Sequence, residues 1–595
     1  MFLREVKRVN KNGTRVSYLQ LVRNDWDPTA RASRTKILYS FGRSDQVDPA
    51  AIERLIASLQ RLLDPATAFT ATTGVTSPAL TMQQARPMGG THVLDGMWHG
   101  LGIDEVMAKL LVGRRRDPRV ERVLFALVAN RALDASSKLA AAGWVSDDVH
   151  IAGLPEVSDD ACYRAMDWLI EIAPDLEREV FWQVATLLDL EVDLLFFDTT
   201  STYFERDTAD GPILRDGQGR AVPEPNNDTE DTEAGRTGTA GGAPATDTAG
   251  GAPGDGERVG FRTYGKSKDH RDDLPQIVIG MAVTRTGIPV RVWSWPGNTT
   301  DTALIRQVKA DMRDWTLSRI VWVADRGFSS AENRRYLRRG DHHYIVGEKL
   351  RGGSPEATAA LSRPGRYATI KENMRVKEVR ISEHERFVIC HNPEGAQRDA
   401  AVRAELLDRL AALIADTDTL APDERAKLRG VISTKPGLNR FLRVTGGGLL
   451  RIDKAKIKTE TNLDGTYLLR CSDPHLPAED IALGYKQLLE VERGWRDMKQ
   501  IINLRPVHHR LEDRIRAHVL LCWLALLLIR IIENTTGATW NRLTAELGRL
   551  HVITYTGPAG TFQQRTELTP AQRDIYTTLE LTPPKKIIEL AGPSV

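Results

Sequence analysis

The sequence predicts an α/β fold in which a mixed sheet is flanked by helices. Two short apolar runs typical of buried strands, Leu194 to Phe197 and Ile320 to Ala324, each end in an aspartate. Two longer apolar runs, 277–283 and 288–295, are separated by the residues TRTG and predict a hairpin. A helical pattern over 300–315 lies between the hairpin and the second aspartate-terminated strand. Strands that alternate with helices in this order are typical of a single α/β sheet.

Residues 1–65 predict a small basic module of β-sheet and one helix. Two alternating runs flank Asn12-Gly13, a strong signal for a hairpin turn, and Lys36 to Phe41 predicts a third strand. Asp48-Pro49 then begins an amphipathic helix that runs to Leu63. Residues 1–43 hold ten Lys and Arg against three Asp and Glu. This excess of positive charge fits either DNA contact or a solvated sheet that packs on the rest of the chain.

Residues 89–190 predict a helical domain, a candidate for DNA binding, which follows a linker of Thr, Ala, Ser and Pro at 66–88. Arg114, Arg115 and Arg116 stand just before a helix that begins at Asp117-Pro118. Cations at the start of a helix oppose its macrodipole, so a nearby anion would stabilise them. A phosphate backbone and protein counter-ions are both open as that anion.

The first part of the core is expected over 191–348, with an interruption at 207–258. That stretch is rich in Gly, Pro, Thr and Ala, repeats TAGGAP, and holds eleven Asp and Glu against four Lys and Arg. Such a composition buries too little apolar area to offset the entropy of ordering. We therefore expect a disordered acidic insertion in a surface loop.

A β-rich insertion domain, separate from the sheet, is expected over 349–475. A long helix from Ala478 to Gln500 opens the last part of the core, 476–535, and residues 536–595 are a candidate for oligomerisation. The apolar stretch between Arg516 and Arg530 is about 13 residues long, below the roughly 18 that a membrane span needs, so we expect a core helix. The start of the chain lacks the apolar region of a signal peptide, and four scattered cysteines predict buried thiols.

Three acids are candidates for a shared metal site. Asp198 and Asp325 end predicted strands, and the 478–500 helix offers Tyr485, Glu492 and Lys499 at seven-residue spacing, near one face. Glu490 competes with Glu492 but points about 200° away on a regular helix. Three converging carboxylates can hold two hard divalent ions, which prefer oxygen ligands.

These residues resemble the DDE transposases of bacterial insertion sequences. The resemblance rests on FDTTS at Asp198, ADRGF at Asp325, PGNTTD ending at Asp301, and the pattern of Tyr485, Glu492 and Lys499 followed by RPVHHR. It covers roughly 194–533 and points more narrowly to the subgroup with a Tyr-Arg-Glu-Lys signature and a β-rich insertion before the Glu. It implies an RNase H-like core and a catalytic, metal-binding triad of Asp198, Asp325 and Glu492.

The resemblance also implies ligands and partners. It implies two Mg²⁺ or Mn²⁺ ions per site, cleavage at the terminal inverted repeats, and transfer of the 3′-hydroxyl into target DNA. A homodimer on DNA and a cytoplasmic, nucleoid-associated location are expected, with no membrane partner. The signature's Arg corresponds to Leu488 here, and Lys486 or Arg493 could take over its phosphate contact. The candidate DNA-binding residues are Tyr264, Lys268, His270, Arg271, Arg326, Tyr485, Arg493, Lys499, Arg505 and Arg510.

Two other functions compete with this one. A DNA-binding protein derived from a transposase would keep the basic surfaces and lack catalysis. A phosphatase with Asp198 as nucleophile would usually carry a second Asp two residues later, where this chain has Thr200.

Overall fold

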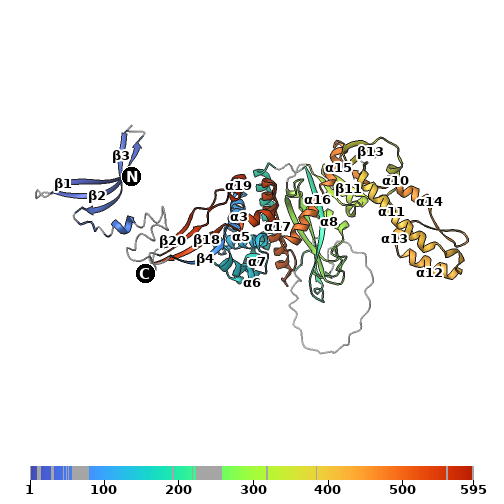
Figure 1. Ribbon diagram of the computed structural model, residues 1–595, viewed down its shortest axis with the longest axis horizontal. Helices are drawn as coiled ribbons and strands as arrows, with labels where there is room; N and C mark the ends of the chain where they lie inside the picture. The colour runs from blue at the N-terminus through green and yellow to red at the C-terminus, as the bar shows by residue number, and fades with distance from the viewer. Residues whose placement is uncertain are drawn as a thin grey trace, which may run out of the picture. The chain divides into compact units, whose positions relative to one another are not determined.

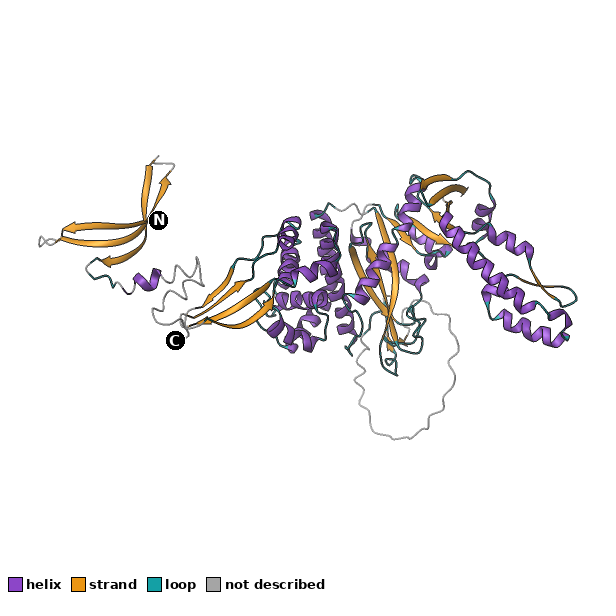
Figure 2. Ribbon diagram, viewed as in Figure 1, coloured by secondary structure: helices purple, strands orange, loops and turns teal. Residues whose placement is uncertain are grey.

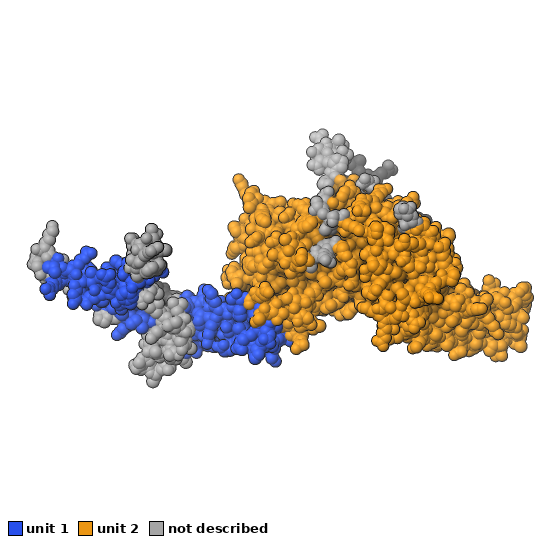
Figure 3. Space-filling model, turned by 90° about the horizontal axis from the view of Figure 1, so that it is seen from above, with its two compact units in different colours: residues 1–89, 545–576, 582–595 blue, residues 90–544, 577–581 orange. Residues whose placement is uncertain are grey.

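The computed structural model divides the chain into two compact units (Figure 3). Unit 1 comprises residues 1–89, 545–576 and 582–595, and unit 2 comprises 90–544 and 577–581. The structure describes residues 2–9, 15–27, 32–44, 46–48, 50, 52–56, 80–189, 193–216, 219–222, 258–315, 319–382, 385–557 and 560–591.

Unit 1 contains two antiparallel sheets. The first has the order β1 (Phe2–Val9), β2 (Arg15–Asp27), β3 (Ala32–Arg43), so the predicted hairpin and third strand are confirmed. Most of the predicted 48–63 helix lies outside the described residues, which are helical at 52–56. The second sheet has the order β20 (Ile587–Ala591), β19 (Gly560–Arg565), β18 (His551–Gly557), β4 (Thr81–Pro87). The C-terminal segment therefore pairs with a strand that precedes the whole of unit 2.

Unit 2 is built on a nine-stranded sheet (Figure 1). Its first five strands lie in the order β9 (Pro289–Pro296), β8 (Gln276–Val283), β5 (Leu194–Tyr203), β10 (Val321–Ala324), β11 (His343–Glu348). β8 is antiparallel to both β5 and β9, whereas β10 is parallel to both β5 and β11. This is the strand order and direction of an RNase H-like core, as the sequence predicts.

Helices cover both faces of this sheet because β5, β8 and β9 are apolar on both sides. On one face Leu195, Phe197 and Trp322 pack with Leu304 and Val308 of α8 (Asp301–Asp311). The helices α15 (Ala478–Lys486) and α16 (Leu489–Gln500) lie over the sheet, where a side chain at Gly484 would meet Leu194 and one at Gly494 would meet Met281. Glycine at both positions lets the helix backbones lie close to the strands.

A helical layer adjoins the core (Figure 2). It consists of α3 (Gly89–Gly100), α4 (Ile103–Leu111), α5 (Val120–Leu133), α6 (Lys138–Gly143) and α7 (Asp159–Leu187), and it packs on α17 (Glu512–Thr536). α17 is long and apolar enough to cross a membrane, but 94% of its apolar window is buried inside the protein. The predicted core helix is confirmed, and the four predicted buried thiols are as well.

The structure corrects the prediction of a separate β-rich insertion over 349–475. Its strands β12 (Ala368–Lys371), β13 (Met374–Ser382), β14 (Glu385–His391) and β17 (Thr466–Cys471) extend the central sheet, because β17 pairs with β11. The rest of the segment is largely helical, with α10 (Pro355–Ser362), α11 (Pro393–Ile414), α12 (Pro422–Ser433), α13 (Pro436–Asn439) and α14 (Lys454–Thr461) around a short hairpin of β15 (Leu442–Val444) and β16 (Leu450–Ile452). The β17 pairing spans more than a hundred residues of sequence, which local patterns do not reveal.

The two ends of the segment predicted to be disordered, 207–258, have regular structure. They form a ladder in which β6 (Ile213–Leu214) pairs with β7 (Arg258–Val259). Arg215 is buried, donates to the carbonyl of Val259 at 2.8 Å, and forms a bidentate pair with Glu512 at 3.1 and 3.0 Å. Residues 223–257, on which the rest of this prediction falls, lie outside the described residues.

Candidate active site

Asp198 and Asp325 occupy neighbouring positions on two parallel strands. β5 and β10 pair so that Phe197 lies opposite Ala324, and each aspartate follows directly. Because paired strands lie about 4.8 Å apart, the two side chains start from adjacent backbone positions. The Asp198 side chain is 22% exposed, whereas Asp325 is exposed and accepts the backbone N–H of Arg326 at 2.6 Å.

A third aspartate, Asp301, reaches the same place from the start of α8. The hydroxyl of Thr199, next to Asp198, donates to Asp301 Oδ1 at 2.6 Å. Asp301 also lies beside Gly327, two residues after Asp325. Asp301 was not among the predicted site residues, although its motif PGNTTD was part of the family resemblance. The signal that could have found it is an acid at a helix start directly after a Pro-Gly turn.

The ammonium of Lys268 lies among these acids. It donates to the carbonyl and the hydroxyl of Thr199 at 2.8 and 2.5 Å, and it is 3.3 Å from Asp301 Oδ2 and 3.8 Å from Asp198 Oδ1. The backbone N–H of Lys268 donates to Ser201 Oγ at 2.9 Å, which fixes the residue against β5. In this structure Lys268 therefore compensates the negative charge of the acids from within the site.

The electrostatics of the site act on Asp198. Withdrawal from water raises the pKa of Asp198 to about 6, and the negative charges of Asp301 and Asp325 add to this effect. Lys268 and the backbone N–H of Thr199 oppose it. A poorly solvated carboxylate thus lies near two further acids, Asp301 and Asp325, an arrangement common at functional sites.

Tyr485 joins the site from α15. Its hydroxyl donates to Asp325 Oδ1 at 3.4 Å, and a side chain on Gly347 would collide with that hydroxyl. Burial and the charge of Asp325 raise the pKa of Tyr485, with a smaller contribution from Glu492. The phenol is therefore neutral near pH 7 and can donate a hydrogen bond.

The predicted continuous helix from Ala478 to Gln500 is wrong, because the helix is interrupted at Gln487 and Leu488. There the N–H of Leu488 bonds the carbonyl of Tyr485, three residues back, so the turn is tighter than an α-helix. The prediction that Tyr485, Glu492 and Lys499 lie near one face assumed a regular helix across this point. Glu492 is exposed on α16 and is close enough to Tyr485 to affect its pKa.

The chemistry of the acids fits a hard divalent ion, since Mg²⁺ and Mn²⁺ prefer carboxylate oxygens. Among the residues that the structure describes, no three His, Cys, Asp or Glu side chains lie close enough together to hold a metal ion. Asp198 and Asp325 are adjacent, but Glu492 does not lie close enough to them to complete a metal site of three carboxylates. The Lys268 ammonium, rather than a third carboxylate, forms an ion pair with Asp198 at 3.8 Å.

Several predicted DNA contacts are engaged within the protein. Lys499 and Arg505 both pair with Asp269 at 2.9 Å. Arg493 pairs with Glu533 at 3.1 Å, and Arg271 pairs with Asp273 at 2.8 Å. These salt bridges reduce the charge that the four cations present to a polyanion.

The other predicted contacts differ in their surroundings. Tyr264 donates its hydroxyl to the carbonyl of Asp207 at 2.8 Å. His270 has a positive φ of 58°, so it lies in a turn that follows Asp269. Arg326 and Arg510 are exposed, Arg326 beside Asp325 and Arg510 in the segment before α17. Of the ten candidates, Lys268, Arg326 and Tyr485 are the ones placed directly at the acids.

A cavity of about 480 Å³ opens beside Asp325 and Tyr485. Arg326, Lys349 and Arg351 line it, together with Tyr467, whose ring stacks on that of Tyr485 with centroids 6.3 Å apart. Cations and flat aromatic surfaces are the groups that bind phosphates and bases of single-stranded nucleic acid. The cavity therefore extends the site in a direction suited to a DNA strand.

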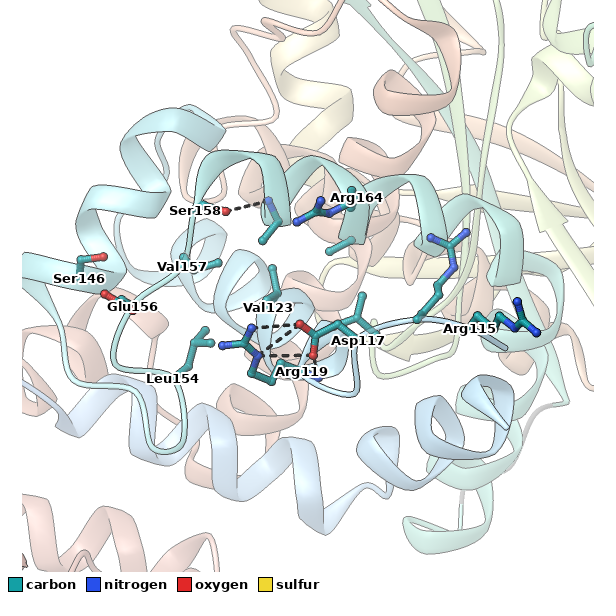
Figure 4. A pocket seen from close by; sticks show the side chains of 14 residues that line it. Arg115, Asp117, Arg119, Val123, Ser146, Leu154, Glu156, Val157, Ser158 and Arg164 are labelled. Carbon is teal, nitrogen blue, oxygen red and sulfur yellow. Dashed lines mark hydrogen bonds and ion pairs between the residues drawn. The ribbon is translucent and has the colours of Figure 1, made fainter. Parts of the chain in front are cut away.

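A second cavity, of about 680 Å³, lies in the helical layer and contains part of the predicted arginine cluster (Figure 4). Arg119 pairs with Asp117 at 3.1 Å, and Arg164 pairs with Asp160 at 2.7 Å. Arg114 and Arg116 both pair with Glu171, at 2.5 and 2.6 Å. The carboxylate of Glu171 therefore serves as a counter-ion for two of the three clustered arginines, which agrees with one of the two open alternatives.

Comparisons with known proteins identify two transposase domains in this chain. Residues 251–528 match the family model described as transposase DDE domain, and residues 3–68 match the model described as IS1634 family transposase, N-terminal domain. No curated protein matches the chain. A cryo-EM structure of a piggyBac transposase synaptic complex with hairpin DNA is 12% identical over 78% of this chain and 82% of that chain. The TM-score between the two structures is 0.33.

The two family matches are separate in sequence and together span more than half of the chain. One of them covers Asp301, Asp325 and Glu492, and the other covers the N-terminal sheet. Enzymes of this kind cut DNA and join its strands in reactions that depend on divalent metal ions. The chain belongs to the DDE transposases of insertion sequences.

Proposed function

We propose that this DNA transposase cuts the terminal inverted repeats of its element with a triad of Asp198, Asp325 and Glu492, and joins the freed 3′-hydroxyl to target DNA. The observation that carries the proposal is the adjacency of Asp198, midway along β5, and Asp325, directly after the parallel strand β10, with the Glu492-bearing helix α16 packed on β5. Ligands in open α/β sheets bind at such carboxyl ends of strands.

We assign the metal ligands to the same triad, with Mg²⁺ or Mn²⁺ as the ion and two ions per site. Bound ions would supply charge stabilisation for the attacking and leaving oxygens of the phosphodiester. The protein's part is to present deprotonated carboxylates, so Asp198 must lose the proton that its raised pKa favours at low pH. Tyr485, as a neutral donor beside Asp325, orients that carboxylate through its 3.4 Å hydrogen bond.

Asp301 and Lys268 are proposed as positioning residues. Thr199 connects them to β5, because it donates to Asp301 and accepts from Lys268. Closure of the triad around metal requires Lys268 to give up its contact with Asp198, since the two cations would repel each other. Lys268 would then be available to a DNA phosphate, the partner that the sequence predicts for it.

The DNA contacts at Tyr264, His270, Arg271, Arg326, Arg493, Lys499, Arg505 and Arg510 are kept as proposals. Arg326 has the best support, because it is exposed beside Asp325 and lines the adjoining cavity. The salt bridges of Lys499 and Arg505 with Asp269 would have to exchange for phosphate contacts. A homodimer on paired ends and a nucleoid-associated location are likewise proposed from the family.

The decisive experiment measures cleavage of the element's ends. Purified full-length protein is mixed with DNA that spans the edges of the element, with Mg²⁺ or Mn²⁺, and products are resolved on a denaturing gel. Asp198→Asn, Asp325→Asn and Glu492→Gln should each abolish cleavage, because each removes one charged ligand. Glu490→Gln, on the same helix, is the matched control and should retain cleavage. Undiminished cleavage by Asp198→Asn would sink the proposal, and loss in Glu490→Gln alone would reassign the third acid.

A further inference from the structure

A small, mainly helical subdomain forms the far part of the segment between β14 and β17. It has its own apolar core of Leu410, Ile432, Leu438 and Phe441, to which α11, α12, α13 and the β15–β16 hairpin contribute. Figure 1 shows α11 to α14 lying together beyond the β12–β14 end of the sheet. We call residues 425–458 of this part the basic lobe.

The charge of the basic lobe is strongly one-sided. Residues 425–458 contain ten Lys and Arg and one acid, Asp453. The whole chain has a formal net charge of only +2. Apart from residues 1–43, this lobe is where the sequence concentrates positive charge, and a concentrated field of one sign attracts a polyanion.

Most of these cations are free to bind a ligand. Arg425, Arg440 and Arg451 are engaged, with backbone carbonyls, Glu460 and Asp418 respectively. Within the part of the chain that the structure describes, the other seven have neither an ion pair nor a side-chain hydrogen bond, and all seven are exposed. They are Lys427, Arg429, Lys435, Arg443, Lys454, Lys456 and Lys458.

The lobe is tied to the active site by a buried acid. Glu460, at the end of α14, accepts from Arg351 at 2.6 Å and pairs with Arg440 at 3.3 Å. Arg351 and Leu350 line the 480 Å³ cavity beside Asp325. They also line a neighbouring cavity of about 240 Å³, which Arg440 and Glu460 border. A path of adjoining hollows therefore leads from Asp325 toward the lobe.

We propose that the basic lobe is a DNA-binding site that holds the sugar-phosphate backbone of a duplex bound at the active site. The inference rests on the proposed function for the nature of the substrate and on the lobe's charge for the contact. Lysines dominate the free cations, and the lysine ammonium is a point charge suited to phosphate rather than to base edges. The lobe would therefore add affinity without sequence preference.

The hairpin between β15 and β16 fits this role. Its tip is Gly446, Gly447 and Gly448, and none of the three has a neighbouring atom within 4 Å of where a side chain would lie. Arg443 precedes the tip and Arg451 follows it. The N–H of Gly448 donates to the carbonyl of Thr445 at 2.9 Å, and a tip without side chains lets the N–H groups of Gly446 and Gly447 approach a phosphate closely.

The test measures how salt affects DNA binding. Full-length protein that carries Asp198→Asn is titrated in EDTA with a fluorescent duplex of random sequence, across a series of NaCl concentrations. Neither cleavage nor metal binding enters this measurement, so failure of the proposed catalytic triad would leave its outcome unchanged. The test variant adds Lys454→Gln, Lys456→Gln and Lys458→Gln. The control adds Arg542→Gln, Arg549→Gln and Arg573→Gln, from a stretch, 540–580, with four basic and four acidic residues.

The expected result is a shallower salt dependence in the test variant. The slope of log affinity against log salt should fall in magnitude by about 1 to 3, and binding near 0.1 M salt should weaken more than about tenfold. The control should keep the parental slope. If the α14 variant loses its circular dichroism spectrum, Lys427→Gln with Arg429→Gln on α12 takes its place, with an expected fall in slope of about 1 to 2.

Two outcomes would overturn the proposal. One is a folded lobe variant whose slope and affinity equal those of the control. The other is a variant that binds the duplex normally but loses binding to polyglutamate, which would make the lobe a surface for acidic proteins.

Discussion

The ammonium of Lys268 lies 3.3 Å from the carboxylate of Asp301, and this pair brings a cation and an unassigned acid into the predicted metal site. Lys268 belongs to a loop far from both Asp198 and Asp301 in sequence, and Thr199 holds it there. The pair places a counter-charge among three aspartates that lie near one another. It also gives the site a built-in competitor for any cation that enters.

Asp301→Asn should lower cleavage about 10- to 100-fold, the usual cost when an outer partner of a metal site is changed. The variant keeps the hydrogen bond from Thr199 but loses the charge that pairs with Lys268. Binding of end DNA in EDTA should stay at the parental level, and the cleavage defect should shrink when Mg²⁺ is raised. Asp311→Asn, at the other end of α8, is the control. Parental cleavage at low Mg²⁺ would contradict a positioning role.

Asp198→Asn should stabilise the protein at pH 7. The folded state raises the pKa of Asp198 to about 6 from its ordinary value of 3.8, so folding disfavours the charged form. Stability from this group is complete below pH 4 and is lost as the pH rises to 6. The gain from the variant should be about 1–3 kcal/mol at pH 7 and should vanish near pH 4. Urea unfolding at both pH values measures it, with exposed Asp423→Asn as control; a gain of equal size at both would be contrary evidence.

Tyr485→Phe should reduce cleavage by less than about tenfold, because it removes one long hydrogen bond to Asp325 and keeps the ring. Tyr467→Phe is a close control, since its ring stacks on Tyr485 while its hydroxyl contacts Met374. Single-turnover cleavage with saturating DNA separates the chemical step from binding. Equal effects of the two variants would show that the phenol of Tyr485 has no separate role.

Lys138→Met should stabilise unit 2. Lys138 is buried at the start of α6, and burial, together with nearby Arg131, lowers its pKa to about 7. Because the unfolded chain binds the proton more tightly, stability from this group rises as the pH goes from 7 to about 10. The variant should therefore gain about 2–4 kcal/mol at pH 7, with a smaller gain at higher pH. Lys138→Arg, which keeps the charge, should show no gain in the same urea titration.

The sequence predicts the features that local patterns determine. Apolar runs of strand length identify β5 and β10, and Asp325 follows β10 directly as predicted, whereas β5 continues past Asp198 to Tyr203. The break between α15 and α16 was missed, because Gln487 and Leu488 are ordinary helix residues and the close packing of Gly484 on Leu194 is a tertiary effect. The contacts of Asp301 and Lys268 were missed for the same reason. Pairing of β17 with β11 depends on residues more than a hundred positions apart.

The ladder between Ile213–Leu214 and Arg258–Val259 has a practical consequence for work on this enzyme. It closes the loop that leaves β5, and Arg215 fixes the closure to Glu512 of the core helix. A segment inserted between β6 and β7 therefore begins and ends at neighbouring points, so we expect it to leave the position of Asp198 unchanged. A fluorescent protein spliced between residues 223 and 257 would report the position of the transposase on DNA while leaving the chemistry intact.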